Sequence, residues 1–155
     1  SCFFVGGYEP IRANVVRTLT PVLENCGYKT DFYLLDKYDN QDNYPDNCQN
    51  KKLSYQENIE KAKRCSVMLE INKPEQQGLT LRALEDLILN KKLITTNASI
   101  KNMALYHPDR IFIFNGVNTE SLEAFLHSGL PERDEKLLRQ YCADSLLTTL
   151  QKHHP

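Results

Sequence analysis

Short apolar runs without polar alternation recur along this chain, and segments whose apolar residues repeat at helical spacing lie between them. Unbroken apolar runs of this length are typical of strands buried on both faces, as in a parallel sheet covered by helices. The expected strands are Cys2–Val5, Phe32–Leu35, Val67–Ile71, a short strand from Leu93, and Ile111–Phe114. Parallel strands are joined through helical crossovers, so this alternation constrains the fold more than any other feature.

The segments between the strands carry helix signals of their own. Apolar residues at helical spacing predict a helix over 11–26, which Gly27 ends as the C′ residue. Pro21 lies inside this helix and is expected to kink it. Ser54 and Glu57 have the spacing of a capping box and predict the start of a second helix.

The alternation predicts an α/β fold, a three-layer Rossmann-like sandwich with a mostly parallel sheet of about five strands. The 155 residues suit a single domain, 1–155. We expect the polar stretch 36–52 to be a loop and 132–152 to form C-terminal helices that are broken near Asp144. Ligands of such folds bind at the carboxyl ends of the strands, so functional residues are expected there.

Charge and hydropathy exclude several classes of function. The net charge of -1 provides no strong field for duplex nucleic acid or for anionic membranes. No apolar run is long enough for a transmembrane helix, and no leader peptide is visible. The five cysteines are odd in number and none are paired at CxxC spacing, which argues against zinc and favours reduced thiols. We therefore expect a cytoplasmic protein that does not bind nucleic acid.

Motifs for phosphate, dinucleotide and metal chemistry have no counterpart in this sequence. It contains no P-loop, no G-x-G-x-x-G, no D-x-D and no H-E-x-x-H. The Asp residues of the loop 36–52 lack the glycine and the closing glutamate of an EF-hand. The sequence therefore predicts no cofactor and no metal.

The segment 76–85 follows a strand and opens a helix, which is where a ligand is expected. Free backbone N–H groups and the helix dipole favour an anion at such a helix start. Gly78 allows close approach of the backbone, Thr80 offers a hydroxyl, and Arg82 a fixed positive charge, which together suit a diphosphate. Glu85 lies one turn further on and can accept hydrogen bonds from the hydroxyls of a ribose. The alternative is an ordinary amphipathic helix with an exposed Arg82–Glu85 pair.

The stretch from Gln77 to Thr96 resembles the signature of GT-B-fold glycosyltransferases, with Gln77 in place of the first glutamate and Glu85 matching the second. The resemblance is closer to bacterial lipopolysaccharide and capsular polysaccharide biosynthesis proteins. They carry a similar Gln-x-Gly-Leu-Thr-x-Arg-x-x-Glu run, a Lys-Lys-Leu-Ile-Thr-x-Asn run, and an early Phe-x-Gly followed by an arginine, here Arg12. The similarity covers nearly the whole chain, although the usual C-terminal tryptophan has no counterpart.

This resemblance implies a metal-independent domain that binds a nucleoside-diphosphate sugar as the donor. It places Gly6, Gly7 and Arg12 near the donor phosphates and Tyr55 near the base. Glu70, a carboxylate inside an apolar strand, is a further candidate because its burial is costly unless it is paired. The candidate donor-binding residues are Gly6, Gly7, Arg12, Tyr55, Glu70, Gln77, Gly78, Leu79, Thr80, Arg82 and Glu85.

We expect this chain to be the C-terminal half of a longer protein, because its first strand begins directly after Ser1. The resemblance implies that the absent N-terminal half carries the catalytic base and binds a saccharide or lipid-linked saccharide acceptor. The full protein is then expected at the inner face of the cell membrane, as a peripheral protein. The chain alone is expected to bind nucleotide without transferring sugar.

Two other functions remain open on the sequence. Nucleoside deoxyribosyltransferase-like enzymes also combine a Gly- and Thr-containing turn with a helix glutamate, which in them is the covalent nucleophile. Their spacing from glycine to glutamate is shorter than that from Gly78 to Glu85. A non-catalytic Rossmann-like interaction module is the other alternative, and failure to bind any nucleotide would favour it.

Overall fold

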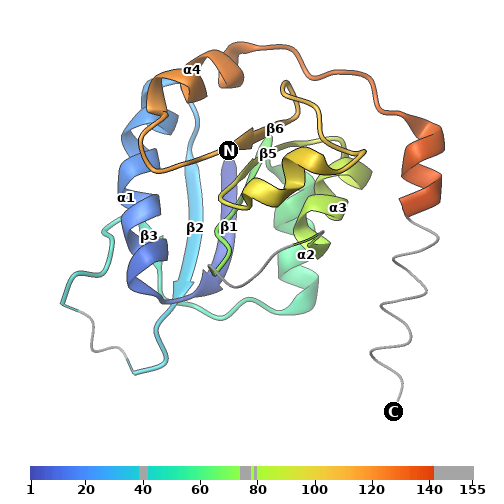
Figure 1. The fold of residues 1–155 in the computed structure, drawn as a ribbon. Helices are drawn as coiled ribbons and strands as arrows, with labels where there is room; N and C mark the ends of the chain where they lie inside the picture. The colour runs from blue at the N-terminus through green and yellow to red at the C-terminus, as the bar shows by residue number, and fades with distance from the viewer. Residues whose placement is uncertain (39–41, 74–77, 79, 142–155) are drawn as a thin grey trace.

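The computed structural model describes residues 1–38, 42–73, 78 and 80–141 and has a parallel sheet at its centre (Figure 1). The strands are β1 (Cys2–Gly7), β2 (Thr30–Leu35), β3 (Cys48–Gln49), β4 (Val67–Glu70), β5 (Lys92–Thr95) and β6 (Ile111–Ile113). Their order across the sheet is β3-β2-β1-β4-β5-β6, and every described pair is parallel. This is the doubly wound arrangement, so the α/β prediction is confirmed.

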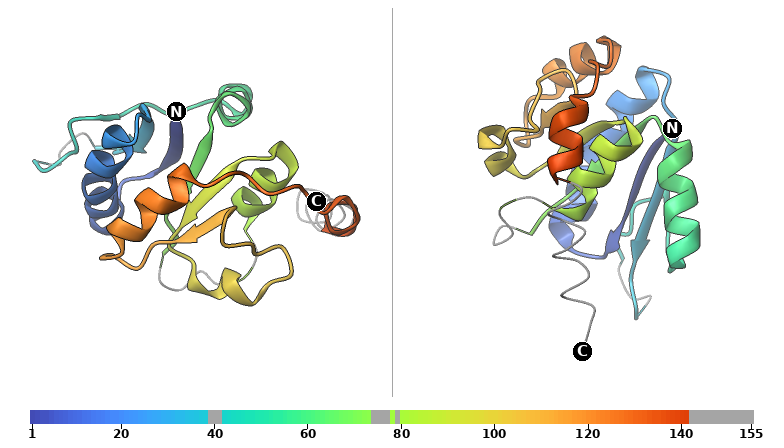
Figure 2. Two further views of the ribbon diagram at one scale, coloured as in Figure 1. Left: turned by 90° about the horizontal axis from the view of Figure 1, so that it is seen from above. Right: turned by 90° about the vertical axis from the view of Figure 1, so that its right-hand side faces the viewer.

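Helices cover both faces of the sheet (Figures 1 and 2). They are α1 (Pro10–Asn25), α2 (Tyr55–Arg64), α3 (Leu81–Leu89), the 3₁₀ helix η1 (Ala98–Asn102) and α4 (Thr119–His127). Helices α1 and α4 pack on one face, and α2 and α3 on the other. Residues 135–141 are helical within the predicted range 132–152, whereas residues 132–134 are not helical and the expected break near Asp144 falls outside the described residues. Among the described helices, none has the length and apolar character needed to cross a membrane.

The prediction that 36–52 forms only a loop is wrong at Cys48–Gln49, which add the edge strand β3. Cys48 pairs with Phe32 of β2, and Gln49 pairs with Tyr33. The strand is only two residues long, so it contains no apolar run that a pattern search would detect. The side chain of Asn47, just before the strand, hydrogen-bonds to neighbouring elements and helps to hold it in place.

Helix α1 ends where the sequence predicts, with Gly27 as its C′ residue. Gly27 has a φ of 87°, which favours glycine, and its N–H donates to the carbonyl of Glu24 at 3.0 Å. The N–H of Tyr28 donates to the carbonyl of Leu23 at 2.9 Å, which completes a Schellman motif. The helix runs continuously from Pro10 to Asn25 with Pro21 inside it, and the kink expected there stays a prediction.

Successive residues of each central strand face opposite layers of helices. Phe4 of β1 packs with Leu19 and Leu23 of α1 in one buried cluster. Phe3, its neighbour in sequence, packs with Leu87 of α3 and Ala62 of α2 in the other. The sheet is therefore buried on both faces, which explains why its strands read as unbroken apolar runs.

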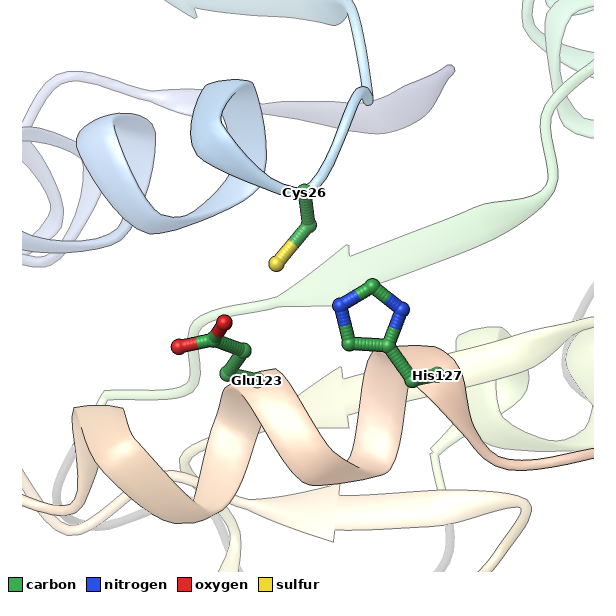
Figure 3. Close-up of side chains that lie close together, drawn as sticks. All are labelled: Cys26, Glu123 and His127. Carbon is green, nitrogen blue, oxygen red and sulfur yellow. The ribbon is translucent and has the colours of Figure 1, made fainter.

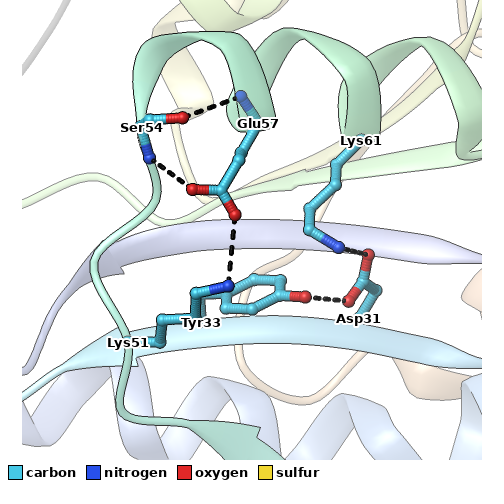
Figure 4. Close-up of polar contacts among 6 residues, drawn as sticks. All are labelled: Asp31, Tyr33, Lys51, Ser54, Glu57 and Lys61. Carbon is cyan, nitrogen blue, oxygen red and sulfur yellow. Dashed lines mark hydrogen bonds and ion pairs between the residues drawn. The ribbon is translucent and has the colours of Figure 1, made fainter.

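Helix α2 is fastened at its first turn and again near its end (Figure 4). The hydroxyl of Ser54 accepts from the N–H of Glu57 at 3.1 Å, and the N–H of Ser54 donates to the Glu57 carboxylate at 3.2 Å, which confirms the capping box. Further along, Lys61 forms an ion pair with Asp31 of β2 at 3.4 Å, and the Tyr33 hydroxyl donates to the same carboxylate at 2.7 Å. These contacts fix the position of the helix over β2.

Candidate functional site

The direction in which the strands are added reverses at β1, which lies between β2 and β4. Such a switch point opens a crevice at the carboxyl ends of the strands. Arg12, in the first turn of α1, spans it: its Nε donates to the carbonyl of Ile71 at 3.1 Å and its Nη1 donates to that of Gly7 at 3.1 Å. The guanidinium has further N–H groups that can face a ligand. The assignment of Arg12 to the donor phosphates stays a prediction.

Gly6 and Gly7 end β1 beside this arginine. A Cβ on Gly6 would lie 2.9 Å from the ring of Phe4 and 3.5 Å from Nη1 of Arg12. Glycine at this position therefore serves packing as well as close approach of a ligand. Both glycines lie at the carboxyl end of β1, where the fold predicts that a ligand binds.

Glu70 ends β4 and is buried, but its carboxylate has a partner. The hydroxyl of Thr95, on the neighbouring strand β5, donates to it at 2.8 Å and accepts from the N–H of Asn97 at 3.0 Å. This chain of hydrogen bonds offsets the cost of burying the carboxylate. Glu70 thus links the ends of β4 and β5, and a contact with a donor stays a prediction.

The turn before α3 is attached to the start of η1. Gly78 has a φ of 94°; its N–H donates to the hydroxyl of Ser99 at 3.1 Å, and its carbonyl accepts from the side chain of Asn97 at 2.8 Å. Because a positive φ favours glycine, the turn requires this residue type. Gln77 and Leu79, on either side, lie outside the described residues.

Thr80 is the N-cap of α3. Its hydroxyl oxygen accepts from the N–H of Ala83 at 3.2 Å, which satisfies one of the free donors at the helix start. The hydroxyl hydrogen remains able to donate to a ligand, because a hydroxyl group both donates and accepts.

Arg82 and Glu85 form the pair that the sequence indicates, and Asn58 of α2 joins them. Nη1 of Arg82 lies 2.9 Å from a carboxylate oxygen of Glu85, and its Nη2 donates to Asn58 at 3.1 Å. The guanidinium also lies over the ring of Phe3, 5.4 Å from its centroid. The pair therefore lies between α2 and α3 instead of on an open helix surface, and the role of Arg82 at the phosphates stays a prediction.

A pocket of about 190 Å³ lies between α2 and α3. It is lined by Tyr55, Asn58, Ile59, Ala62, Glu85, Ile88 and Leu89. Tyr55, which is 80% exposed, and Glu85 were both predicted as donor-binding residues, and the fold brings them to the same pocket. Its size is below the roughly 300–1,000 Å³ of sites that enclose a whole drug-sized ligand, so it suits one part of a larger molecule.

Two larger hollows lie away from the predicted residues. One, of about 530 Å³, follows the edge strand β6 and is bordered by η1 and α4; another, of about 510 Å³, lies beside the loop 42–47. Neither is lined by a candidate donor-binding residue. The predicted side chains Tyr55 and Glu85 instead converge at the smaller pocket between α2 and α3.

Sequence reasoning missed two buried polar groups near this region. Asp86 of α3 is fully buried, and neither of its carboxylate oxygens has a hydrogen-bond partner among the described residues. Burial raises the pKa of Asp86 well above its ordinary value, although the positive charge of Arg110 opposes the shift. The side-chain nitrogen of Asn72, just after β4, is likewise unpartnered within the described chain. Asp86 occupies an ordinary polar position in the helical pattern, so only the packing of α3 reveals its burial.

No family model, curated protein or solved structure matches this chain. The α/β fold therefore stands on the geometry described above. What the chain binds has to be argued from the pocket and from the residues at the carboxyl ends of the strands.

Proposed function

We propose that this chain binds a nucleoside-diphosphate sugar, as the donor-binding domain of a glycosyltransferase of bacterial lipopolysaccharide or capsule biosynthesis. The observation that carries the proposal is the pocket between α2 and α3, which Tyr55 and Glu85 both line. Tyr55 is the first residue of α2 and Glu85 lies in the middle of α3, and the sequence predicts a nucleoside contact for both. Their convergence supports a nucleoside site.

In the proposed complex the pocket holds the nucleoside. The exposed ring of Tyr55 provides a flat surface on which the base stacks, an interaction worth about 1–3 kcal/mol. The Glu85 carboxylate accepts hydrogen bonds from the ribose hydroxyls while Arg82, held by Asn58, keeps it in position.

The diphosphate then extends toward the start of α3 and the crevice at β1. Free N–H groups of the first helical turn, the Thr80 hydroxyl and the close backbone approach at Gly78 favour an anion there. Arg12 at the switch point adds positive charge. During transfer these groups would stabilise the negative charge that develops on the leaving diphosphate.

Calorimetric titration of the chain with a panel of nucleoside diphosphates tests the proposal. We expect one of them to bind with a Kd of about 10–1000 μM, equivalent to about −7 to −4 kcal/mol. Glu85→Ala should weaken binding about tenfold or more because the ribose loses its acceptor. The matched control is Glu60→Ala, which removes an exposed carboxylate of α2 outside the pocket and should leave the affinity unchanged.

Two results would contradict the proposal. If no nucleoside diphosphate binds, a non-catalytic interaction module becomes the better explanation. A covalent glycosyl adduct on Glu85 after incubation with a nucleoside, detected by mass spectrometry, would instead favour a nucleoside deoxyribosyltransferase-like enzyme.

A further inference from the structure

Three potential metal ligands converge at the end of the sheet where the strands begin, opposite the carboxyl ends. Figure 3 shows the three side chains. They are Cys26 at the C-cap of α1, and Glu123 and His127 on α4. Glu123 and His127 are four residues apart and therefore share one face of the helix. One ligand atom from each residue lies within 4.8 Å of the other two.

The backbone around these side chains is firmly held. The N–H of Cys26 donates to the carbonyls of Val22 and Leu23, and the Schellman motif follows directly. The hydroxyl of Tyr28 donates to the carbonyl of Leu126 at 3.3 Å, which connects the turn after α1 to the last turn of α4. The relative position of the cysteine and α4 is therefore fixed by the fold, while the exposed Glu123 and His127 side chains can adjust.

We propose that Cys26, Glu123 and His127 bind a zinc-class divalent cation, with water as the fourth ligand. Sulfur, imidazole nitrogen and carboxylate oxygen are the ligands that Zn²⁺ prefers. Bond lengths of about 2.0–2.3 Å place tetrahedral ligands about 3.3–3.8 Å apart, so atoms that lie within 4.8 Å of one another need to approach by at most about 1.5 Å. Rotation of the two exposed side chains supplies that movement.

The charges of the three groups suit this cation. A thiolate and a carboxylate together neutralise the charge of a divalent ion, and the neutral imidazole completes the set. Burial and the neighbouring Glu123 raise the pKa of the Cys26 thiol. Because sulfur binds the metal as a thiolate, the thiol proton is released when the metal binds.

This proposal is independent of the nucleotide site. The three residues lie at the amino ends of the strands, whereas the donor site is proposed at the carboxyl ends. The absence of CxxC spacing in the sequence does not bear on it, because the cysteine and the helix that provides the other ligands are far apart in the chain. The bound ion would connect α1 to α4 and stabilise the folded chain.

Titration of the metal-free, reduced full chain with Co²⁺, which reports its ligands by absorption, tests the site. We expect a thiolate-to-cobalt charge-transfer band that saturates at about one equivalent, and displacement of the ion by Zn²⁺. Cys26→Ser should abolish the band, and His127→Ala should weaken binding on the order of 10–100-fold or more. Zn²⁺, but not Mg²⁺, should raise the melting temperature of the unaltered chain.

Substitutions of other histidines distinguish Co²⁺ binding at this site from binding elsewhere in the chain. His107→Ala removes an exposed histidine elsewhere, and the pair His153→Ala/His154→Ala removes two adjacent histidines near the end of the sequence. Both variants should retain the band. If Cys26→Ser proves unstable, Glu123→Gln and His127→Ala, which alter exposed side chains, still test the site. Absence of the band in the unaltered chain, or equal Co²⁺ affinity in all variants, would overturn the proposal.

Discussion

The two helical layers differ in how they satisfy the charged groups that are buried against the sheet. Beneath α1 and α4 the described core is an apolar cluster that includes Leu19 and Phe125, and the buried Lys92 of β5 donates to the carbonyl of Phe125. The layer of α2 and α3 also has an apolar cluster, but Arg82 is partly enclosed in it and Asp86 is fully buried. Burying such groups is costly unless they are paired. The difference teaches that the buried charge of the first layer is satisfied by hydrogen bonds, whereas the second layer keeps a carboxylate without a hydrogen-bond partner among the described residues.

The two polar groups of the second layer also differ from each other. Arg82 is satisfied by Asn58 and Glu85, so most of its desolvation is offset. Asp86 has no such partner among the described residues. Substitutions in the layer that lines the proposed nucleotide pocket can therefore raise the free energy of unfolding. This pattern is common where function constrains the sequence.

The largest expected effect lies in the layer of α1 and α4. Leu19→Ala empties a fully buried position of α1 and should lower the free energy of unfolding by about 2–5 kcal/mol. Ile88→Ala, at a 39% exposed position beside the pocket, should cost less than about 1 kcal/mol. Urea denaturation measures both. Equal losses would contradict the difference in burial between the two positions.

Next comes the effect of Asp86→Asn, which should raise the free energy of unfolding at pH 7. Because burial raises the pKa of Asp86 in the folded state, the native protein holds a proton that the unfolded chain releases above about pH 4. The stability of the unaltered chain therefore declines as the pH rises from that value toward the folded pKa. The variant should lack this decline, as measured by urea denaturation between pH 4 and pH 8. A difference between the two proteins that does not change with pH would contradict the assignment.

Arg82→Ala tests whether the layer of α2 and α3 contacts the phosphates of the ligand. We expect about a tenfold loss of affinity for the nucleoside diphosphate, equivalent to about 1.4 kcal/mol, and a smaller loss for the bare nucleoside. Arg17→Ala, on the other helical layer, is the control and should change neither affinity. Equal losses for the two ligands in calorimetry would mean that Arg82 acts only by holding Glu85 in the pocket.

The smallest expected effect is at the start of α2. Ser54→Ala removes the acceptor for the N–H of Glu57 and should cost about 1 kcal/mol in thermal or urea denaturation. Ser121→Ala, at an exposed position of α4, should stay within about 0.5 kcal/mol of the unaltered chain. If the two substitutions lower the free energy of unfolding by the same amount, the capping box contributes little to the stability of the protein.

Local signals predicted much of this fold because they depend on neighbouring residues. The unbroken apolar run at β1, the Schellman end at Gly27 and the capping box at Ser54 are all properties of short segments. β3 escaped prediction because its pairing, not its own two residues, makes it a strand. Strand order cannot be derived from segments at all, because it depends on which apolar faces meet.

The candidate site was predicted only in part for the same reason. The pairing of Arg82 with Glu85 follows from their helical spacing, but the hydrogen bond to Asn58 requires α2 and α3 to be neighbours. The grouping of Cys26 with Glu123 and His127 likewise depends on how α4 packs beside α1. Contacts between distant segments are set by tertiary packing, which a single sequence does not display.

The place of β1 in the sheet also has a consequence for the order in which the chain folds. Cys2 pairs with Thr30 on one side and with Val67 on the other, so the first strand is completed only when two later segments reach it. Each pairing closes a long loop before it gains stabilising contacts. The entropy lost in closing that loop slows folding. β1 leaves the ribosome before β4 does, so one of its edges stays open until β4 emerges. During that interval its apolar residues are exposed to other chains, so the expected weakness of this fold is aggregation during folding rather than instability once folded.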